Sequence, residues 1–211
     1  MPVSSHIPTP TVERLAAYLG CLREMRDEGR QTVSSQELAQ RAGSNSAQVR
    51  KDLSHLGQIG TPGVGYQVSA LHDRLARALG LAEGHKVLLV GVGSLGRALS
   101  LYRGFRQEGF TIAALFDNDP QKIGKRVGGL EVRPLAELQS VNRDLRASIG
   151  VIAVPAEQAQ SVAEALVAAG VKGILNFAPV RLRLPEHISV RAVDLTRELA
   201  VLSYNLTGAG R

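Results

Sequence analysis

The chain has 211 residues, of which 44% are hydrophobic, so it is long enough for one large domain or two small ones with apolar cores. Its formal net charge is +6, and because the basic residues are spread along the chain, this charge permits an anionic partner without identifying one. No run approaches the roughly 20 apolar residues that span a bilayer, and the first residues lack the basic and apolar segments of a signal peptide. The single cysteine, Cys21, excludes an internal disulfide and is expected to be a core thiol. We therefore expect a cytoplasmic protein without a membrane partner.

The first sixty residues predict three helices. A first helix ends near Gly29, and its apolar positions at helical spacing are Val12, Leu15, Ala16, Leu19, Leu22 and Met25. In the second helix Ser34 and Glu37 have the spacing of a capping box, and Gly43 marks the end. A third helix is predicted over residues 44–57, with an apolar face made of Val49, Leu53 and Leu56.

A hairpin is predicted after the third helix. Residues 57–68, GQIGTPGVGYQV, offer two extended segments around Pro62 and Gly63, a pair that suits the centre of a type II turn. Three helices followed by a hairpin describe a winged helix-turn-helix. Residues 71–80 then predict a linking helix that Gly80 ends.

The third helix has a polar face of the kind that reads DNA. If its apolar residues point inward, Ala47, Lys51 and Ser54 lie on the opposite face, with Gln48 and Arg50 at its edges. Small residues allow close approach to a DNA groove, and the long polar side chains reach phosphates and base edges. A winged helix can also serve protein contacts, and in that alternative Arg50 and Lys51 are merely solvated.

Beyond residue 80 the pattern changes to strands that alternate with helices, which predicts a parallel sheet and an α/β fold. The predicted strands cover residues 86–90, 111–116, 149–154 and 173–177. The predicted helices between them cover residues 95–107 and 156–169.

A last helix is predicted to follow Asp194, which is placed to cap it. This helix carries a stripe of Leu195, Leu199, Leu202 and Leu206, which suits a dimer contact or packing within one chain. The expected domains are residues 1–80, 81–193 and 194–211.

The glycines Gly91, Gly93 and Gly96 form a G-x-G-x-x-G turn that follows a predicted strand and opens a predicted helix. In that context the backbone amides and the helix N-terminus can receive a pyrophosphate. Asp117 lies 21 residues past Gly96, at the end of the next strand, where a carboxylate can accept hydrogen bonds from the adenine ribose. The same carboxylate would repel a 2′-phosphate and so favour NAD(H) over NADP(H), although nearby Lys122 would weaken that exclusion. The alternative is a glycine turn that serves only strand-to-helix packing.

Catalytic residues are scarce in this half of the chain. Neither His85 nor His187 is tied to a strand end, and we find no nucleophile motif, metal cluster or acid–base pair. We therefore expect a nucleotide that is bound and not consumed, no metal, and no enzyme activity.

Both halves together resemble the Rex family of redox-sensing transcriptional repressors. The motifs that carry the resemblance are AQVRKDLS at 47–54, GVGY at 63–66, GVGSLGRAL at 91–99, FDNDPQKIG at 116–124, VPAEQAQSVAEALVAAGVKGILNFAP at 154–179 and VDLTREL at 193–199. The resemblance implies a homodimer with a winged helix, a Rossmann-like domain and a C-terminal helix swapped between subunits. It also implies binding to inverted-repeat operator DNA with NAD+ or no ligand, and release by NADH.

The residues and the resemblance together define the expected sites. The expected DNA contacts are Ser46, Ala47, Gln48, Arg50, Lys51, Ser54 and Tyr66. The expected cofactor contacts are Gly91, Val92, Gly93, Ser94, Leu95, Gly96, Asp117, Asn118, Lys122, Ile123, Val154, Pro155, Ala156, Asn176, Phe177, Ala178 and Pro179. The resemblance implies that Tyr102 and Asp194 make contacts that change between the DNA-bound and NADH-bound states.

Two positions depart from the family pattern. The family commonly has a basic residue before GVGY, where this chain has Pro62, so a cationic hook into the minor groove is in doubt. Some relatives have an arginine where this chain has Gly20, so an ion pair with the residue matching Asp194 cannot form in the same way. Two other functions stay open on the sequence alone: a small NAD-dependent oxidoreductase with an accessory N-terminal domain, and a DNA-binding sensor of another adenine-containing ligand such as coenzyme A.

Overall fold

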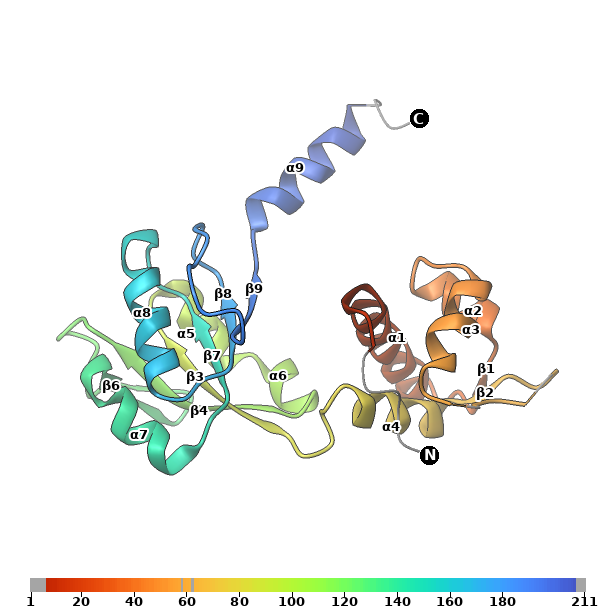
Figure 1. Cartoon of the computed structure of the whole chain (residues 1–211), viewed down its shortest axis with the longest axis horizontal. Helices are drawn as coiled ribbons and strands as arrows, with labels where there is room; N and C mark the ends of the chain where they lie inside the picture. The colour runs from red at the N-terminus through yellow and green to blue at the C-terminus, as the bar shows by residue number, and fades with distance from the viewer. Residues whose placement is uncertain (1–6, 58, 62, 208–211) are drawn as a thin grey trace. The chain divides into compact units, whose positions relative to one another are not determined.

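The computed structural model describes residues 7–57, 59–61 and 63–207, and the chain divides into two compact units (Figure 1). The first unit is Met1–Glu83 and the second is Gly84–Arg211. Pro62, one of the two departures from the family pattern, lies outside the described residues.

The first unit is helical, with a small two-stranded sheet. Its elements are α1 (Thr9–Asp27), β1 (Thr32–Val33), α2 (Ser35–Arg41), α3 (Ser46–Ser54), β2 (Tyr66–Gln67) and α4 (Val68–Ala78). The capping box of α2 forms as predicted, because the Glu37 amide donates to Ser34 Oγ at 3.1 Å and the Ser34 amide donates to Glu37 Oε2 at 2.8 Å. These bonds and Arg30 lower the pKa of Glu37 to about 2. The α3 N-cap is Asn45, whose Oδ1 accepts from the Gln48 amide.

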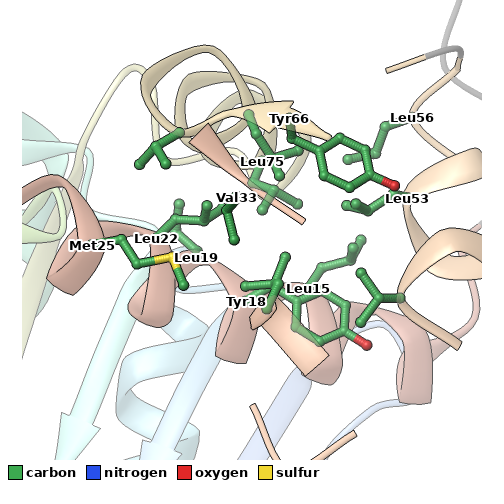
Figure 2. Packing of buried hydrophobic residues seen from close by; sticks show 14 of the residues in the cluster. Leu15, Tyr18, Leu19, Leu22, Met25, Val33, Leu53, Leu56, Tyr66 and Leu75 are labelled. Atoms are coloured by element: carbon green, nitrogen blue, oxygen red, sulfur yellow. The ribbon is translucent and has the colours of Figure 1, made fainter. Parts of the chain in front are cut away.

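One core holds these helices together (Figure 2). Apolar side chains of α1 face side chains from α3, β1, β2 and α4, among them Leu53, Val33, Tyr66 and Leu75. The buried positions of α1 differ from the prediction: Val12 and Ala16 are exposed, and Tyr18 is buried instead. The helix therefore turns a face toward its neighbours that includes a tyrosine hydroxyl. Cys21 packs at the edge of this core, and burial raises the pKa of its thiol.

The hairpin after α3 closes where the sequence predicts it. The Thr61 amide donates to the Gly65 carbonyl at 2.9 Å, and the Gly65 amide donates to the Thr61 carbonyl at 3.0 Å. The returning segment continues into β2, which pairs antiparallel with β1 in the register Val33 to Tyr66. The sequence did not predict this pairing, which ties the hairpin to the core.

The described residues of the second unit form a seven-stranded sheet in the order β5-β6-β4-β3-β7-β8-β9. Its strands are β3 (His85–Val90), β4 (Phe110–Asp117), β5 (Arg126–Val127), β6 (Leu130–Pro134), β7 (Ile149–Ile152), β8 (Gly173–Asn176) and β9 (Ser189–Ala192). Six of them run parallel, and β5 is an antiparallel edge strand. From β3 the chain adds β4 and β6 on one side and then returns to add β7, β8 and β9 on the other. This is the doubly wound order, and its switch point lies between β3 and β7, where such sheets bind ligands.

Helices cover both faces of the sheet. The covering helices are α5 (Ser94–Leu101), α6 (Arg103–Gln107), the short 3₁₀ helix η1 (Leu135–Glu137), α7 (Leu138–Leu145) and α8 (Ala156–Ala168). Helix α9 (Leu195–Leu206) follows β9. Leu88 and Val90 pack with residues of α7 and α8 on one face, while Val87 and Leu89 pack on the other face, where Leu99 of α5 joins them.

The prediction of one continuous helix over residues 95–107 is wrong. Tyr102 has an extended backbone (φ −71°, ψ 110°) that ends α5 and precedes α6. Its ring lies edge-on to Phe105 with 5.2 Å between ring centroids, and it occupies the space that a side chain at Gly104 would need. Aromatic packing therefore stabilises the break.

Helix α9 follows the edge strand β9 and extends away from the sheet (Figure 1). Every described residue of α9 is exposed, including the whole leucine stripe. Leu195, Leu199 and Leu202 are each more than half exposed, and Leu206 is 87% exposed. Among the residues that the structure describes, no helix has the length and apolar character to cross a membrane.

Candidate nucleotide pocket and DNA-contacting surface

The glycine turn sits at the switch point of the sheet, between the end of β3 and the start of α5. Gly91 has φ +95°, and a side chain there would strike the Ala153 carbonyl after β7. A side chain at Gly96 would overlap the Gly91 carbonyl, so this glycine allows α5 to pack closely on the turn. Gly93, by contrast, faces open space. The turn therefore leaves its backbone accessible at Gly93, as close approach of a pyrophosphate requires.

Asp117 ends β4 and is bonded to the same turn. Its Oδ2 accepts from the Val92 amide at 2.7 Å and from Lys122 Nζ at 3.1 Å, and its Oδ1 accepts from the Asp119 amide at 2.9 Å. Burial alone would raise the pKa of Asp117, but these hydrogen bonds outweigh it and lower the pKa below its usual value. The carboxylate is thus charged at neutral pH and positions both the glycine turn and its own loop.

A hollow of about 420 Å³ opens between these groups and the end of β7. Its lining residues are Gly91, Gly93, Asp117, Asn118, Asp119, Lys122, Ala153, Val154, Pro155 and Gln158. Seven of them are among the expected cofactor contacts, and Asp119, Ala153 and Gln158 were missed. The sequence did offer a signal for Asp119: it lies two residues after Asp117 and three before Lys122, in the same loop of turn-forming residues. Val92, Ser94, Leu95, Gly96, Ile123 and Ala156 lie outside this lining, so their contact with a nucleotide stays a prediction.

The turn after β8 is built around Asn176, which is 1% exposed. Its amide donates to the carbonyls of Ala178 and Val180 at 3.1 and 3.0 Å, and its Oδ1 accepts from the Ala178 amide at 3.0 Å. The side chain of Asn176 therefore holds the turn together, and its contact with a nucleotide stays a prediction. For Phe177, Ala178 and Pro179, contact with a nucleotide stays a prediction.

The two expected switch residues occupy element ends. Tyr102 separates α5 from α6 and is 62% exposed. Asp194 caps α9 as predicted, because its Oδ1 accepts from the amides of Thr196 and Arg197 at 3.0 and 3.1 Å. A contact of either residue that changes with the bound nucleotide stays a prediction.

On α3 the predicted polar face is exposed to solvent. Ala47, Arg50, Lys51 and Ser54 are exposed, and Ser46 and Gln48 are half-buried. Arg50 Nη1 donates to Ser35 Oγ at 3.0 Å, which holds the guanidinium beside the start of α2. Arg50 and Ser35 both line a hollow of about 570 Å³ between α2, α3 and the hairpin.

Tyr66 differs from the other expected DNA contacts. It is only 9% exposed and belongs to the core of the first unit, at the rim of the same hollow. Its ring fills the space beside Gly60, which has φ +94°. Tyr66 therefore supports the hairpin, and little of its side chain is left for DNA.

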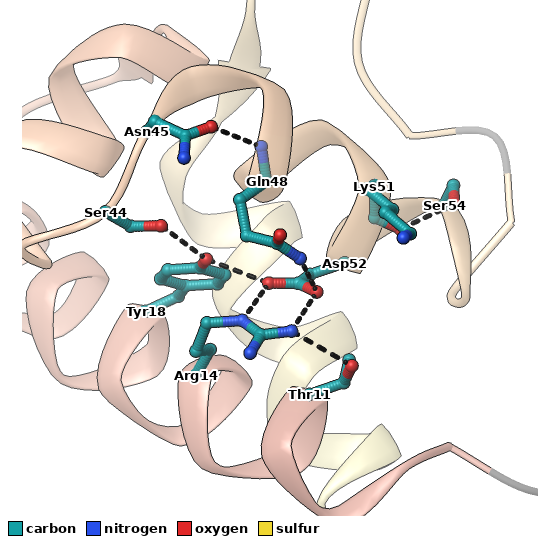
Figure 3. Close-up of polar contacts among 9 residues, drawn as sticks. All are labelled: Thr11, Arg14, Tyr18, Ser44, Asn45, Gln48, Lys51, Asp52 and Ser54. Carbon is teal, nitrogen blue, oxygen red and sulfur yellow. Dashed lines mark hydrogen bonds and ion pairs between the residues drawn. The ribbon is translucent and has the colours of Figure 1, made fainter.

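A buried polar network fixes the back of α3 (Figure 3), and the sequence analysis missed it. Asp52 is 1% exposed and accepts two 2.7 Å hydrogen bonds from Arg14, at Nε and Nη2. The Tyr18 hydroxyl donates to Asp52 at 3.0 Å and Gln48 Nε2 donates at 2.8 Å. Asp52 lies three residues after Val49, so a carboxylate at a core-facing helical position was the available signal.

This network keeps Asp52 charged although it is buried. Burial alone would raise the pKa of Asp52, but the hydrogen bonds from Arg14, Gln48 and Tyr18 lower it. The Arg14 pKa is raised, chiefly by its hydrogen bond to Asp52. Because Arg14 and Tyr18 belong to α1, the network ties α3 to α1 on the side opposite its exposed face.

Each unit matches a known family. Residues 6–54 match the family described as a putative DNA-binding protein N-terminus, which here covers α1 to α3. Residues 82–180 match the family described as a CoA binding domain, which here covers β3 to β8.

Relatives named redox-sensing transcriptional repressor Rex match nearly the whole chain. The protein from Carboxydothermus hydrogenoformans is 50% identical over 200 residues, which is 95% of this chain and 96% of that protein. The one from Streptomyces coelicolor is 50% identical over 202 residues, which is 96% of this chain and 78% of that protein.

Solved structures of a Rex-family repressor are also similar to this chain. The structure of RSP in complex with beta-NAD+ and operator DNA aligns with a TM-score of 0.90 at 30% identity, and the alignment covers 98% of this chain and 95% of that one. RSP in complex with beta-NADH aligns with a TM-score of 0.88 at 29% identity, and covers 98% and 97%. With these relatives, its winged helix and its doubly wound sheet, the chain belongs to the Rex family of redox-sensing transcriptional repressors.

Proposed function

We propose that this protein is a repressor that binds operator DNA with NAD+ or no ligand and releases it when NADH is bound. The observation that carries the proposal is the union, in one Rex-family chain, of an exposed basic helix face with a hollow at the switch point of a doubly wound sheet. RSP, which is similar over 98% of this chain, has been crystallised with beta-NAD+ and operator DNA and with beta-NADH. The relatives are repressors, which argues against the oxidoreductase alternative.

The nicotinamide end of the ligand must supply the signal. A ligand shifts a two-state equilibrium only through differential affinity, and a change from 1:99 to 99:1 needs about 5.5 kcal/mol. NAD+ and NADH differ by a hydride and by the charge of the nicotinamide ring. Phe177 packs against an apolar cluster of the second unit. A nicotinamide placed beside it would favour the neutral ring of NADH, because desolvation of a cation is costly. The glycine turn and Asp117 bind the part that both forms share.

DNA contact is assigned to the exposed face of α3 and the hollow beside it. Arg50 and Lys51 neutralise phosphates, Ser46, Ala47, Gln48 and Ser54 approach the groove, and Tyr66 supports the hairpin. A homodimer places two such faces on an inverted repeat, whose half-sites lie about one DNA turn apart. The leucine stripe of α9, which is exposed in one chain, is where a second copy is proposed to pack.

In this proposal the domains are residues 1–80 for DNA, 81–193 for the nucleotide and 194–211 for the dimer contact, with Tyr102 and Asp194 in the switch. The cytoplasm is the proposed location, because the protein there meets both DNA and the nicotinamide pool.

Replacement of Lys51 by alanine tests the DNA-contacting face. With a duplex selected from a random library by the wild-type protein, Lys51→Ala is expected to weaken binding about tenfold and to reduce the salt dependence by about one phosphate contact. NADH affinity is expected to stay unchanged. Lys172→Ala removes an exposed lysine from the second unit as a matched control. If both variants bind the duplex as tightly as the wild type in a gel-shift titration, the assignment of this face is wrong.

A second candidate ligand comes from the match of residues 82–180 to a CoA binding domain. Coenzyme A shares the adenine and pyrophosphate that the glycine turn would hold. Native mass spectrometry of the purified protein identifies the bound nucleotide. Displacement of NADH by micromolar coenzyme A would favour this second candidate.

A further inference from the structure

Lys122 is held between two carboxylates at the rim of the nucleotide hollow. Its Nζ lies 3.1 Å from Asp117 Oδ2 and 3.6 Å from Asp119 Oδ2. The Asp119 side chain is fixed in turn, because its Oδ1 accepts from the Gln121 amide at 2.9 Å. All three charged side chains line the hollow.

This arrangement bears on which dinucleotide the hollow accepts. A carboxylate in the place of Asp117 receives the adenine ribose in doubly wound nucleotide-binding folds, so a 2′-phosphate would arrive beside Lys122. A free ammonium there would attract the phosphate and offset the repulsion from Asp117. Lys122 is not free, since Asp117 and Asp119 both raise the pKa of its ammonium and hold it. Two carboxylates and one ammonium leave a net charge of −1 at this rim.

We propose that Asp119 is a specificity-determining residue, which holds Lys122 away from a 2′-phosphate and thereby keeps the sensor selective for NADH over NADPH. The inference rests on the proposed function, because it concerns the same nucleotide hollow. The roles of the two carboxylates differ. Asp117 accepts hydrogen bonds from the ribose, whereas Asp119 forms an ion pair with Lys122, whose ammonium would otherwise bind a phosphate. A sensor of this kind ignores the NADPH pool.

The expected effect is moderate because the groups are partly hydrated. The side chains of Lys122 and Asp119 are 37% and 40% exposed, so solvent and salt screen the pair. Without the Asp119 carboxylate, Lys122 keeps only Asp117 as a partner and can turn toward a 2′-phosphate. This freedom and the loss of one negative charge are together expected to strengthen NADPH binding about tenfold, as for a single charge pair near a protein surface. NADH carries no 2′-phosphate to interact with these charges, so the NADH affinity of the same variant is expected to change less than about twofold.

A double-mutant cycle tests the proposal. Dissociation constants of NADH and NADPH are measured by calorimetry on the full chain for the wild type, Asp119→Asn, Lys122→Met and the double variant. Asp119→Asn is expected to tighten NADPH about tenfold in the presence of Lys122 and to have no such effect in the Lys122→Met background. Asp144→Asn, which removes an exposed carboxylate from α7, is the charge-matched control and is expected to leave both affinities unchanged.

The outcomes separate this inference from the proposed function. If Asp119→Asn gains the same NADPH affinity with and without Lys122, the effect is plain charge repulsion and the assigned role of Asp119 is wrong. The role is also wrong if Asp119→Asn gains no NADPH affinity at all. In either case, NADH binding by the wild type would leave the proposed function intact. A wild-type protein that binds neither nucleotide would overturn both.

Discussion

Replacement of Asp52 by alanine is expected to lower the free energy of unfolding of the first unit by about 3 kcal/mol, because three residues that donate four hydrogen bonds lose a buried charged acceptor. Arg14, Tyr18 and Gln48 all donate to this carboxylate, which is 1% exposed. Hydrogen exchange with mass spectrometry is expected to show reduced protection of the amides of α1 and α3. Urea unfolding measures the fall in the free energy of unfolding. DNA affinity is expected to fall with it, since α3 loses its tie to α1.

The control for this prediction is Asp73→Ala, which removes a carboxylate that is 62% exposed on α4. A change within about 0.5 kcal/mol is expected there, as for most surface substitutions. Equal protection of α3 in the Asp52→Ala variant and the wild type would show that the network contributes no stability.

Acid should weaken the same network. The pKa of Asp52 is lower in the folded state than in the unfolded chain, so the unfolded state binds the proton more readily as pH falls. The stabilisation by Asp52 is therefore complete above the unfolded pKa of about 4 and is lost progressively below it. Between pH 5 and 3, stability of the first unit should fall less steeply in Asp52→Asn than in the wild type.

Replacement of Gly93 by alanine is expected to weaken NADH and NAD+ binding about 100-fold, or about 2.7 kcal/mol, while the protein remains folded. Gly93 has φ −77°, which alanine adopts without strain, and its added methyl group meets no protein atom within 4 Å. The methyl group instead takes the space through which a pyrophosphate approaches the backbone. The variant should therefore stay on operator DNA at NADH concentrations that release the wild type.

Gly96→Ala is the informative comparison, because its added methyl group would overlap the Gly91 carbonyl. This variant is expected to lose both nucleotide binding and thermal stability of the second unit, whereas Gly93→Ala keeps the wild-type melting temperature. Wild-type NADH affinity in Gly93→Ala, measured by calorimetry, would reject the glycine turn as the pyrophosphate site.

Local signals in the sequence predicted much of both units. The capping box of Ser34 and Glu37 sets the start of α2, and the glycine turn after an apolar run correctly locates the end of β3. Shorter elements were missed because tertiary pairing, and not local preference, forms them. Strands β1 and β2 have two residues each, and all four residues of β9 are exposed, so none of the three shows an alternating pattern.

The sites were predicted unevenly for the same reason. Gly91, Gly93 and Asp117 carry a recognisable spacing and do meet at one hollow. Two partners of Asp52, Tyr18 and Arg14, come from α1, 34 and 38 residues away in sequence, and no spacing rule brings them together. The role of Asn176 in its turn was not predicted either, because its hydrogen bonds go to backbone groups of the turn that it builds.

The most direct test of the proposed sensor is operator binding measured against the NADH/NAD+ ratio at a fixed total nucleotide concentration. The duplex selected by the wild-type protein is titrated in a gel shift at constant salt, because DNA affinity depends steeply on salt. We expect the wild type to bind the duplex with NAD+ or without nucleotide and to release it as NADH replaces NAD+. The Gly93→Ala variant is expected to stay bound to the duplex at every ratio. Operator affinity that is the same at every NADH/NAD+ ratio would contradict the proposed function.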